Sequence, residues 1–248
     1  MYNQLKEGMK SMFYDKKIYI PTEYCDYTIR LGYCQSFFLL QNAMIDGFEV
    51  YDCGNKGLGE RCNAYWAVTK TKLHINKRAF WGETVDVKSD YINDGKLRVN
   101  VKTNAFNSNG EPLFNGAQEL CVLDKESHRV KRLSDTCLPK PEKQEPLAEF
   151  EKFKIPENSC ATYELTVRSQ HIDMSRHVNN IEYIRMALDL FSVDELINDD
   201  ISDIEVHYIG ECREGETLFC QRFDEGNISF VTISKENKKC FEMKIIRR

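Results

Sequence analysis

The sequence predicts an α+β protein made of two copies of one unit, in each of which a long helix lies against an antiparallel sheet. Three observations lead to this prediction: a short internal repeat, a helical pattern before each copy, and alternating strand-like segments after each copy. One unit alone would expose a sheet edge, whereas two units side by side would form a continuous sheet as an intramolecular pseudo-dimer.

The internal repeat joins residues 73–84, LHINKRAFWGET, to residues 206–217, VHYIGECREGET. The two segments align without a gap, so that His74 meets His207 and the Gly-Glu-Thr triplets coincide. An alternating segment follows each copy, VDVKSDY in the first half and LFCQRF in the second. Both copies therefore have the pattern of a strand, a turn at glycine and a second strand.

A helical pattern precedes each copy of the repeat. In the second half, apolar residues at intervals of three and four predict a helix over 178–197. The same spacing in the first half relates Phe37, Leu40, Met44 and Phe48. Strands are expected at 162–170 before the second helix, and after it near 202–211, 216–223, 228–234 and 239–247.

A segment rich in proline and charge divides the two halves. Residues 138–159 hold Pro139, Pro141, Pro146 and Pro156 out of 6 prolines in the chain. Because proline resists helix interiors and sheet ladders, we expect a crossing linker. The expected organisation is an N-terminal domain over 1–137, a linker over 138–159 and a C-terminal domain over 160–248.

Composition excludes several classes of partner. The net charge of −5 gives no basic face for nucleic acid, and no apolar run reaches the roughly 20 residues of a membrane span. The start of the chain, MYNQLKEGMKSMFYDKK, has no signal-peptide core. The 10 cysteines include no Cys-x-x-Cys pair and no zinc-ligand spacing. We therefore expect a cytoplasmic protein that uses no metal and no cofactor.

Residues 171–191, HIDMSRHVNNIEYIRMALDLF, crowd polar side chains at the start of the second helix. A helix start offers free N–H groups and the positive end of the dipole, which can stabilise an oxyanion. Asp173 and His177 can exchange protons there. Taken singly, each polar residue could equally cap a turn or the helix. The group consists of Asp173, Ser175, His177, Asn179 and Asn180.

Glu211 and Cys212 form a second candidate feature, directly before the glycine turn of the repeat. If the strand near 202–211 continues to its end, Glu211 shares a face with Glu205 and His207. Taken alone, Glu211 could be a solvated edge carboxylate and Cys212 a buried thiol.

The repeat distinguishes the two halves at this point. Arg78 and Ala79 hold the positions of Glu211 and Cys212 in the first half. The first-half loop EYCDYTIRLGY keeps Asp26 but has no histidine. Only the second half therefore carries a full proton-transfer set, as expected of a duplicated enzyme with one working site.

These residues resemble the acyl-acyl-carrier-protein (acyl-ACP) thioesterases of plant plastids and bacteria. That family has a motif close to D-x-N-x-H-V-N-N-x-x-Y, which DMSRHVNNIEY matches at Asp173, His177, Val178, Asn179, Asn180 and Tyr183. A second family feature, Y-x-x-E-C, occurs as Tyr208, Glu211 and Cys212, and the WGETV turn resembles the first half of the family. Ser175 departs from the motif, because its hydroxyl is shorter than an asparagine amide and has one donor proton.

The resemblance implies a tandem hotdog fold, in which each long helix is wrapped by its sheet. It also implies hydrolysis of the thioester of fatty acyl-ACP, which releases a free fatty acid during fatty acid synthesis. The partner would be acyl carrier protein with a fatty acyl-phosphopantetheine arm, and the acyl chain would enter the N-terminal domain. A basic docking patch for this acidic carrier is expected at Lys70, Lys72, Lys77 and Arg78. The chain could be a monomer or a homodimer.

Two mechanisms remain open for the implied catalytic residues. In the first, Glu211 and His177 assist the attack of water, Asp173 positions His177 or the water, and N–H groups near Val178 hold the oxyanion. In the second, Cys212 is the nucleophile and His177 its base. Three other functions also remain open: an acyl-CoA thioesterase, a hotdog dehydratase or hydratase, and a non-catalytic acyl-carrier-binding module.

Overall fold

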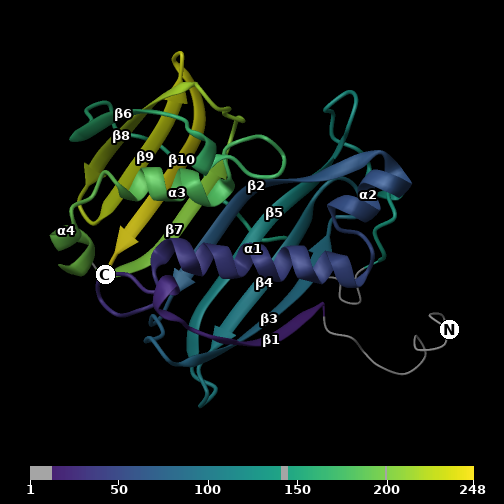
Figure 1. The fold of residues 1–248 in the computed structure, drawn as a ribbon, viewed down its shortest axis with the longest axis horizontal. Helices are drawn as coiled ribbons and strands as arrows, with labels where there is room; N and C mark the ends of the chain where they lie inside the picture. Colours follow the sequence, from purple (N-terminus) through teal and green to yellow (C-terminus); the bar gives the residue numbers. More distant parts are fainter. Residues whose placement is uncertain (1–12, 141–144, 199) are drawn as a thin grey trace.

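The computed structural model describes residues 13–140, 145–198 and 200–248, and within them one 10-stranded antiparallel sheet is covered on one face by helices (Figure 1). The first 12 residues and residues 141–144 of the expected linker lie outside the described part. Predictions about the start of the chain therefore fall largely outside it.

The two halves contain the same elements in the same order. The first half comprises β1 (Tyr14–Tyr19), η1 (Thr22–Tyr24), α1 (Tyr33–Val50), α2 (Asn55–Cys62), β2 (Ala64–Ile75), β3 (Thr84–Asn93), β4 (Val99–Phe106), β5 (Pro112–Asp124) and η2 (Leu133–Asp135). The second half comprises β6 (Ala161–Thr166), η3 (Ser169–His171), α3 (Asn180–Leu188), α4 (Val193–Asn198), β7 (Ile201–Tyr208), β8 (Thr217–Glu225), β9 (Ile228–Lys235) and β10 (Lys238–Arg247). The short helix α4 follows α3 as α2 follows α1, and among the described residues of the second half only η2 has no counterpart.

The strand order shows how the halves join. The sheet runs β1-β3-β4-β5-β2-β7-β10-β9-β8-β6, so each half mirrors the other about the β2–β7 seam. In this antiparallel seam Lys72 pairs with Glu205. These two residues directly precede the two copies of the internal repeat and are therefore equivalent, so a local twofold axis passes between them. The predicted pseudo-dimer with a continuous sheet is confirmed, while the exact domain limits remain a prediction.

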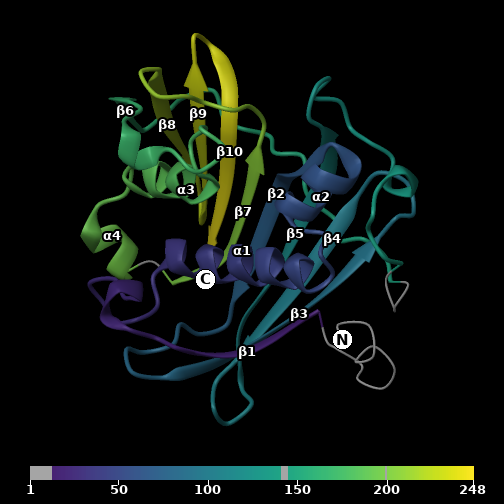
Figure 2. The ribbon, with the colours of Figure 1, turned by 45° about the vertical axis from the view of Figure 1, so that its right-hand side comes forward.

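The helices α1 and α3 lie on the same face of the sheet (Figure 2). The predicted apolar stripe of α1 packs against this face, since Phe37, Leu40, Met44 and Phe48 are all buried. In α3, Ile181 and Ile184 are buried. Each half therefore packs its helix on its part of the sheet, and the buried residues of the two halves form one continuous core.

The predicted helix over 178–197 is wrong in its length. The chain leaves α3 after Leu188 and starts a second helix, α4, at Val193. The break is stabilised by a capping box, in which the Glu195 N–H donates to Ser192 Oγ at 3.2 Å and the Ser192 N–H donates to Glu195 Oε2 at 2.7 Å. The Ser-x-x-Glu signature of this cap is present in the sequence, within a pattern that otherwise favours one helix.

The predicted strand near 202–211 is also too long. It ends at Tyr208, because the N–H groups of Ile209 and Gly210 both donate to the Cys240 carbonyl, at 2.8 and 3.0 Å. Ile209 and Gly210 thus lie opposite one residue of β10, Cys240, as in a β-bulge. Glu211 therefore leaves the sheet and does not share a strand face with His207. The strand predicted at 162–170 likewise ends at Thr166, before η3.

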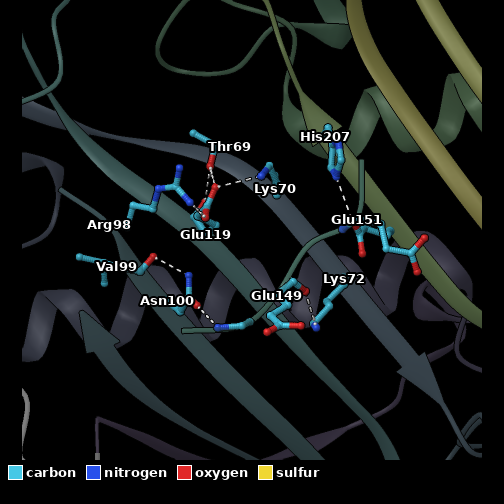
Figure 3. A network of polar contacts seen from close by, with 12 residues as sticks. Thr69, Lys70, Lys72, Arg98, Val99, Asn100, Glu119, Glu149, Glu151 and His207 are labelled. Carbon is cyan, nitrogen blue, oxygen red and sulfur yellow. Dashed lines mark hydrogen bonds and ion pairs between the residues drawn. The ribbon is translucent and has the colours of Figure 1, made fainter. Parts of the chain in front are cut away.

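The described residues 145–160 contain no helix or strand and cross the outer face of the sheet, opposite α1 (Figure 3). The Phe153 ring stacks on the His207 imidazole with centroids 4.2 Å apart, and Lys72 Nζ donates to the Glu149 carbonyl at 2.8 Å. A cavity of about 700 Å³ lies between this segment and the seam. Two ion pairs lie within its lining, Lys244–Glu151 at 2.6 Å and His74–Asp203 at 2.7 Å. This cavity thus lies on the face of the sheet opposite the helices, and neither His177 nor Glu211 lines it.

Candidate active site

The loop before α3 is a tight turn built by Asp173. The Asp173 N–H donates to the His177 carbonyl at 3.0 Å, and the Arg176 N–H donates to the Asp173 carbonyl at 3.0 Å. The Asp173 carboxylate accepts the Ser175 N–H at 2.8 Å, and Arg176 has a left-handed φ of 63°. This turn presents His177 at the start of α3. The contacts of Asp173 and Ser175 lie within the turn.

His177 and Glu211 come into contact at the mouth of α3, by which we mean the N-terminal end of the helix and the loop before it. A backbone hydrogen bond of 2.9 Å from the Val178 N–H to the Cys212 carbonyl joins their chain neighbours. His177 Nε2 then lies 3.1 Å from Glu211 Oε2, with the side chains 25% and 54% exposed. A carboxylate and an imidazole in contact at an accessible helix start can move a proton between a substrate and solvent.

The Cys212 side chain is fully buried beneath this pair. A hydrogen bond with the Cys240 thiol, together with burial, raises the pKa of the Cys212 thiol well above its usual range. A thiol that stays protonated is a weak nucleophile. The carbonyl of Cys212, in contrast, accepts the Val178 N–H and so helps to bring His177 and Glu211 together.

The start of α3 has free backbone N–H groups, but the N–H of Val178 is not one of them. The Val178 N–H is engaged by Cys212, and the Asn179 side chain accepts the Ile181 N–H at 2.9 Å as an N-cap. Within the described residues, nothing accepts the Asn180 N–H. The Asn180 N–H is therefore available to an oxyanion, two residues after Val178, whose own N–H is engaged.

Sequence reasoning gave no role to three residues near this pair. Lys235 Nζ donates to the Glu211 carbonyl at 2.9 Å. The Tyr183 hydroxyl contacts the backbone on both sides of Glu211. Burial and the charge of Glu211 raise the pKa of Tyr65 on β2, so the first half borders the site. Of the three, only Tyr183 could have been singled out from the sequence, because it is the last residue of the DMSRHVNNIEY motif.

The loop before α1 repeats the turn with different chemistry. The Asp26 N–H donates to the Arg30 carbonyl at 2.9 Å, and the Asp26 carboxylate accepts the Thr28 N–H at 2.8 Å. Arg78, at the position of Glu211, forms an ion pair with Asp26 and donates to Thr28 Oγ1 at 3.0 Å. The mouth of α1 is thus closed by a salt bridge and has no carboxylate–imidazole pair.

The expected basic patch does not form one open surface. The crossing segment covers Lys70 and Lys72, whose Nζ atoms each lie 5.4 Å from the centre of the Phe150 ring. Arg78 is neutralised by Asp26. Of the four residues, Lys77 is the one that is exposed without such a cover.

Two kinds of feature are absent from the described residues. No helix there is long and apolar enough to cross a membrane. No group of three or more His, Cys, Asp or Glu residues in that part of the chain could hold a metal ion. All 10 cysteines are free thiols.

The fold and the site define a tandem hotdog protein with a carboxylate–imidazole pair at one of its two helix mouths. Comparison with known proteins narrows this class: residues 156–245 match the acyl-ACP thioesterase C-terminal domain. Among curated proteins, the chain is 24% identical over 195 residues to a chloroplastic palmitoyl-acyl carrier protein thioesterase of Cuphea hookeriana, covering 72% of this chain and 47% of that protein. The chain thus spans about half the length of the curated relatives that it matches.

Solved structures share the fold over nearly the whole chain. An acyl-ACP thioesterase from Bacteroides thetaiotaomicron superposes with a TM-score of 0.82 at 19% identity, covering 94% of this chain and 97% of that one. A 12:0-ACP thioesterase from Umbellularia californica gives 0.81 at 15% identity, covering 95% and 96%. Together these matches confirm the tandem hotdog fold and the resemblance to the acyl-ACP thioesterases.

Proposed function

We propose that this protein hydrolyses the thioester of fatty acyl-ACP and releases a free fatty acid. The observation that carries the proposal is the contact between His177 Nε2 and Glu211 Oε2 at the mouth of α3. The match of residues 156–245 to the acyl-ACP thioesterase C-terminal domain supports it, as do relatives named as acyl-ACP hydrolases. The substrate partner is then acyl carrier protein with its acyl-phosphopantetheine arm.

In the proposed reaction, water is the nucleophile. Glu211 accepts a proton from the water as its oxygen attacks the thioester carbonyl carbon. Glu211 passes this proton to His177 across their 3.1 Å contact, the carbon–sulfur bond breaks, and His177 delivers the proton to the departing pantetheine sulfur. Because a thiolate is a fair leaving group, the protein needs chiefly to place the water and to stabilise the developing charge. The Asn180 N–H, at the positive end of α3, is the proposed oxyanion donor.

Asp173, Ser175 and Cys212 support the pair in this proposal. Asp173 and Ser175 hold the turn that presents His177. Cys212 acts through its backbone carbonyl, which binds the Val178 N–H. The mechanism with Cys212 as nucleophile is disfavoured by the burial and raised pKa of its thiol.

The remaining parts of the proposal concern the rest of the chain. We assign the acyl chain to the N-terminal domain, expected over 1–137, and catalysis to the C-terminal domain, expected over 160–248. The proposed compartment is the cytoplasm, where ten free cysteines would stay reduced.

The test is thiol release from saturated acyl-ACP substrates of about eight to eighteen carbons, with wild type and His177→Ala side by side. We expect turnover that falls by roughly two to four orders of magnitude in the variant, because a general acid–base contributes about that much. The matched acyl-CoA series shows which carrier is preferred. Hydration of enoyl thioesters without hydrolysis would instead establish a hydratase, and binding without turnover an acyl-carrier-binding module.

A further inference from the structure

Tyr183 stands out in the second half, because its hydroxyl contacts the chain on both sides of Glu211. The Cys212 N–H donates to Tyr183 Oη at 2.9 Å, and Tyr183 Oη donates to the Gly210 carbonyl at 3.3 Å. One phenol on α3 thus bridges the residues immediately before and after Glu211. Burial raises the pKa of Tyr183, so the phenol stays protonated and can donate and accept at once.

The ring of Tyr183 is also fixed in place, by burial and by stacking. It is 3% exposed and stacks on Phe241 with centroids 5.5 Å apart and planes 9° apart. The position of the hydroxyl is therefore fixed by packing against β10. Since Tyr183 and His177 belong to the same loop-and-helix unit, the phenol relates the backbone of Glu211 directly to the element that carries His177.

The first half provides an internal comparison. The matching loop hydrogen bonds make Asp26 equivalent to Asp173 and Gly32 equivalent to Asn179, which places Ser36 at the position of Tyr183. The Ser36 hydroxyl donates to Gly32 on its own helix, at 3.1 Å. The half without a carboxylate–imidazole pair thus has no phenol at this position, although both halves keep the same backbone bond between the loop and the strand end.

We infer that Tyr183 is a positioning residue, whose phenol fixes the segment Gly210–Glu211–Cys212 so that the Glu211 carboxylate meets His177. This inference rests on the proposed function only for its effect on catalysis. A misplacement of about 1 Å at a reacting pair can cost roughly a hundredfold in rate. A single buried hydroxyl can thus have a large effect on turnover without touching the substrate.

The first arm of the test measures turnover of Tyr183→Phe, which keeps the ring and removes the hydroxyl. We expect kcat to fall between about tenfold and a hundredfold, with KM nearly unchanged. The matched control is Tyr163→Phe, which removes the hydroxyl of a half-buried tyrosine that donates to the Met186 carbonyl of α3 at 2.6 Å. That variant should lose stability but keep its kcat.

A double-mutant cycle separates positioning from a general loss of stability. In a Glu211→Gln background, Tyr183→Phe should have no further effect on kcat, because the group that it positions is absent. If Tyr183→Phe lowers kcat by the same factor in both backgrounds, the inference is overturned while the proposed function stands.

The second arm does not depend on activity. In crystal structures of the two variants, His177 and Glu211 should have moved apart in Tyr183→Phe and should still be paired in Tyr163→Phe. An unchanged distance between His177 Nε2 and Glu211 Oε2 in Tyr183→Phe overturns the inference, even if the wild type hydrolyses no acyl thioester and the proposed function fails. Should Tyr183→Phe not fold, 4-fluorophenylalanine at position 183 fills the space of the hydroxyl without its donor proton.

Discussion

The mouths of α1 and α3 have the same backbone and opposite chemistry. In each, an aspartate accepts an N–H group two residues later, at 2.8 Å, and the residue after that has a left-handed φ, 59° at Ile29 and 63° at Arg176. In each, a backbone bond ties the loop to the strand end, at 2.8 Å from Leu31 to Ala79 and at 2.9 Å from Val178 to Cys212.

The side chains on this shared frame differ where function is proposed. The first mouth pairs Arg78 with Asp26, at 12% and 17% exposure. The second pairs His177 with Glu211, at 25% and 54% exposure. Features found in both mouths therefore belong to the turn, and features found only in the second are the candidates for the proposed chemistry. By this reasoning Asp173 and Ser175 form the turn, whereas His177 and Glu211 would perform the reaction.

The largest effect on kcat is expected from a substitution that gives the mouth of α3 the arginine found at the mouth of α1. Glu211→Arg replaces the carboxylate by a guanidinium next to Asp173, as Arg78 stands next to Asp26. We expect kcat to fall by about a thousandfold, because the general base is lost. The free energy of unfolding should stay the same or rise, because a new ion pair forms. Thiol release and thermal denaturation measure the two quantities.

The control for this change is Glu214→Arg, which alters the charge equally at an exposed residue of the same turn. It should keep nearly full turnover. If Glu211→Arg retained more than about a tenth of the wild-type kcat, the carboxylate would not be the base and the contrast between the mouths would lose its functional meaning.

Removal of the ion pair between Arg78 and Asp26 at the mouth of α1 should lower the stability of the protein and leave its turnover unchanged. Arg78→Met leaves the Asp26 carboxylate, which is 17% exposed, without its partner. We expect a loss of about 2 kcal/mol in the free energy of unfolding, less than for a fully buried pair because water still reaches the carboxylate. Denaturant titration measures the loss.

Two further variants sharpen this second prediction. Lys77→Met removes a neighbouring exposed charge and should be nearly neutral. Adding Asp26→Asn to Arg78→Met should recover part of the lost stability, because no unpaired carboxylate then remains. A drop in kcat in Arg78→Met would mean that the first mouth takes part in the reaction.

A smaller effect is expected at Asp173, where two substitutions separate the turn from the charge. Asp173→Asn keeps an oxygen that can accept the Ser175 N–H, so kcat should stay within about threefold of wild type. Asp173→Ala removes the acceptor and loosens the loop that presents His177, and we expect a loss of about tenfold. Equal losses in the two variants would show that the negative charge of Asp173 is needed, contrary to its role as a turn former.

The sequence was sufficient to predict the fold because the relevant signals are local or repeated. The repeat at His74 and His207 predicted the pseudo-dimer, and the spacing of Phe37 to Phe48 predicted α1. The errors lie where a local contact interrupts a periodic pattern: the Ser192 cap divides the second helix, and the bulge opposite Cys240 ends β7 before Glu211.

At the site, the residue types were predictable and their relations were not. A motif can single out His177 and Glu211, but their contact depends on a backbone bond between Val178 and Cys212, which lie in separate loops, before α3 and after β7. Two other contacts also join distant parts of the chain: the Tyr183 hydroxyl binds the Cys212 N–H, and Lys235 donates to the Glu211 carbonyl. Such contacts have no periodic signature in a single sequence.

The smallest effect is expected at Cys212, for which the first half already contains the substitution. Ala79 occupies the equivalent position, and its carbonyl accepts the Leu31 N–H as the Cys212 carbonyl accepts the Val178 N–H. Cys212→Ala should therefore keep the backbone bond, and kcat should remain within about threefold of wild type. The loss of a buried thiol should cost about 1 kcal/mol of stability. A loss of turnover above about a hundredfold, at unchanged fold by circular dichroism, would instead make the thiol the nucleophile and His177 its base. Both mouths would then still share their turn, but the essential difference between them would be the sulfur at position 212 and not the carboxylate at position 211.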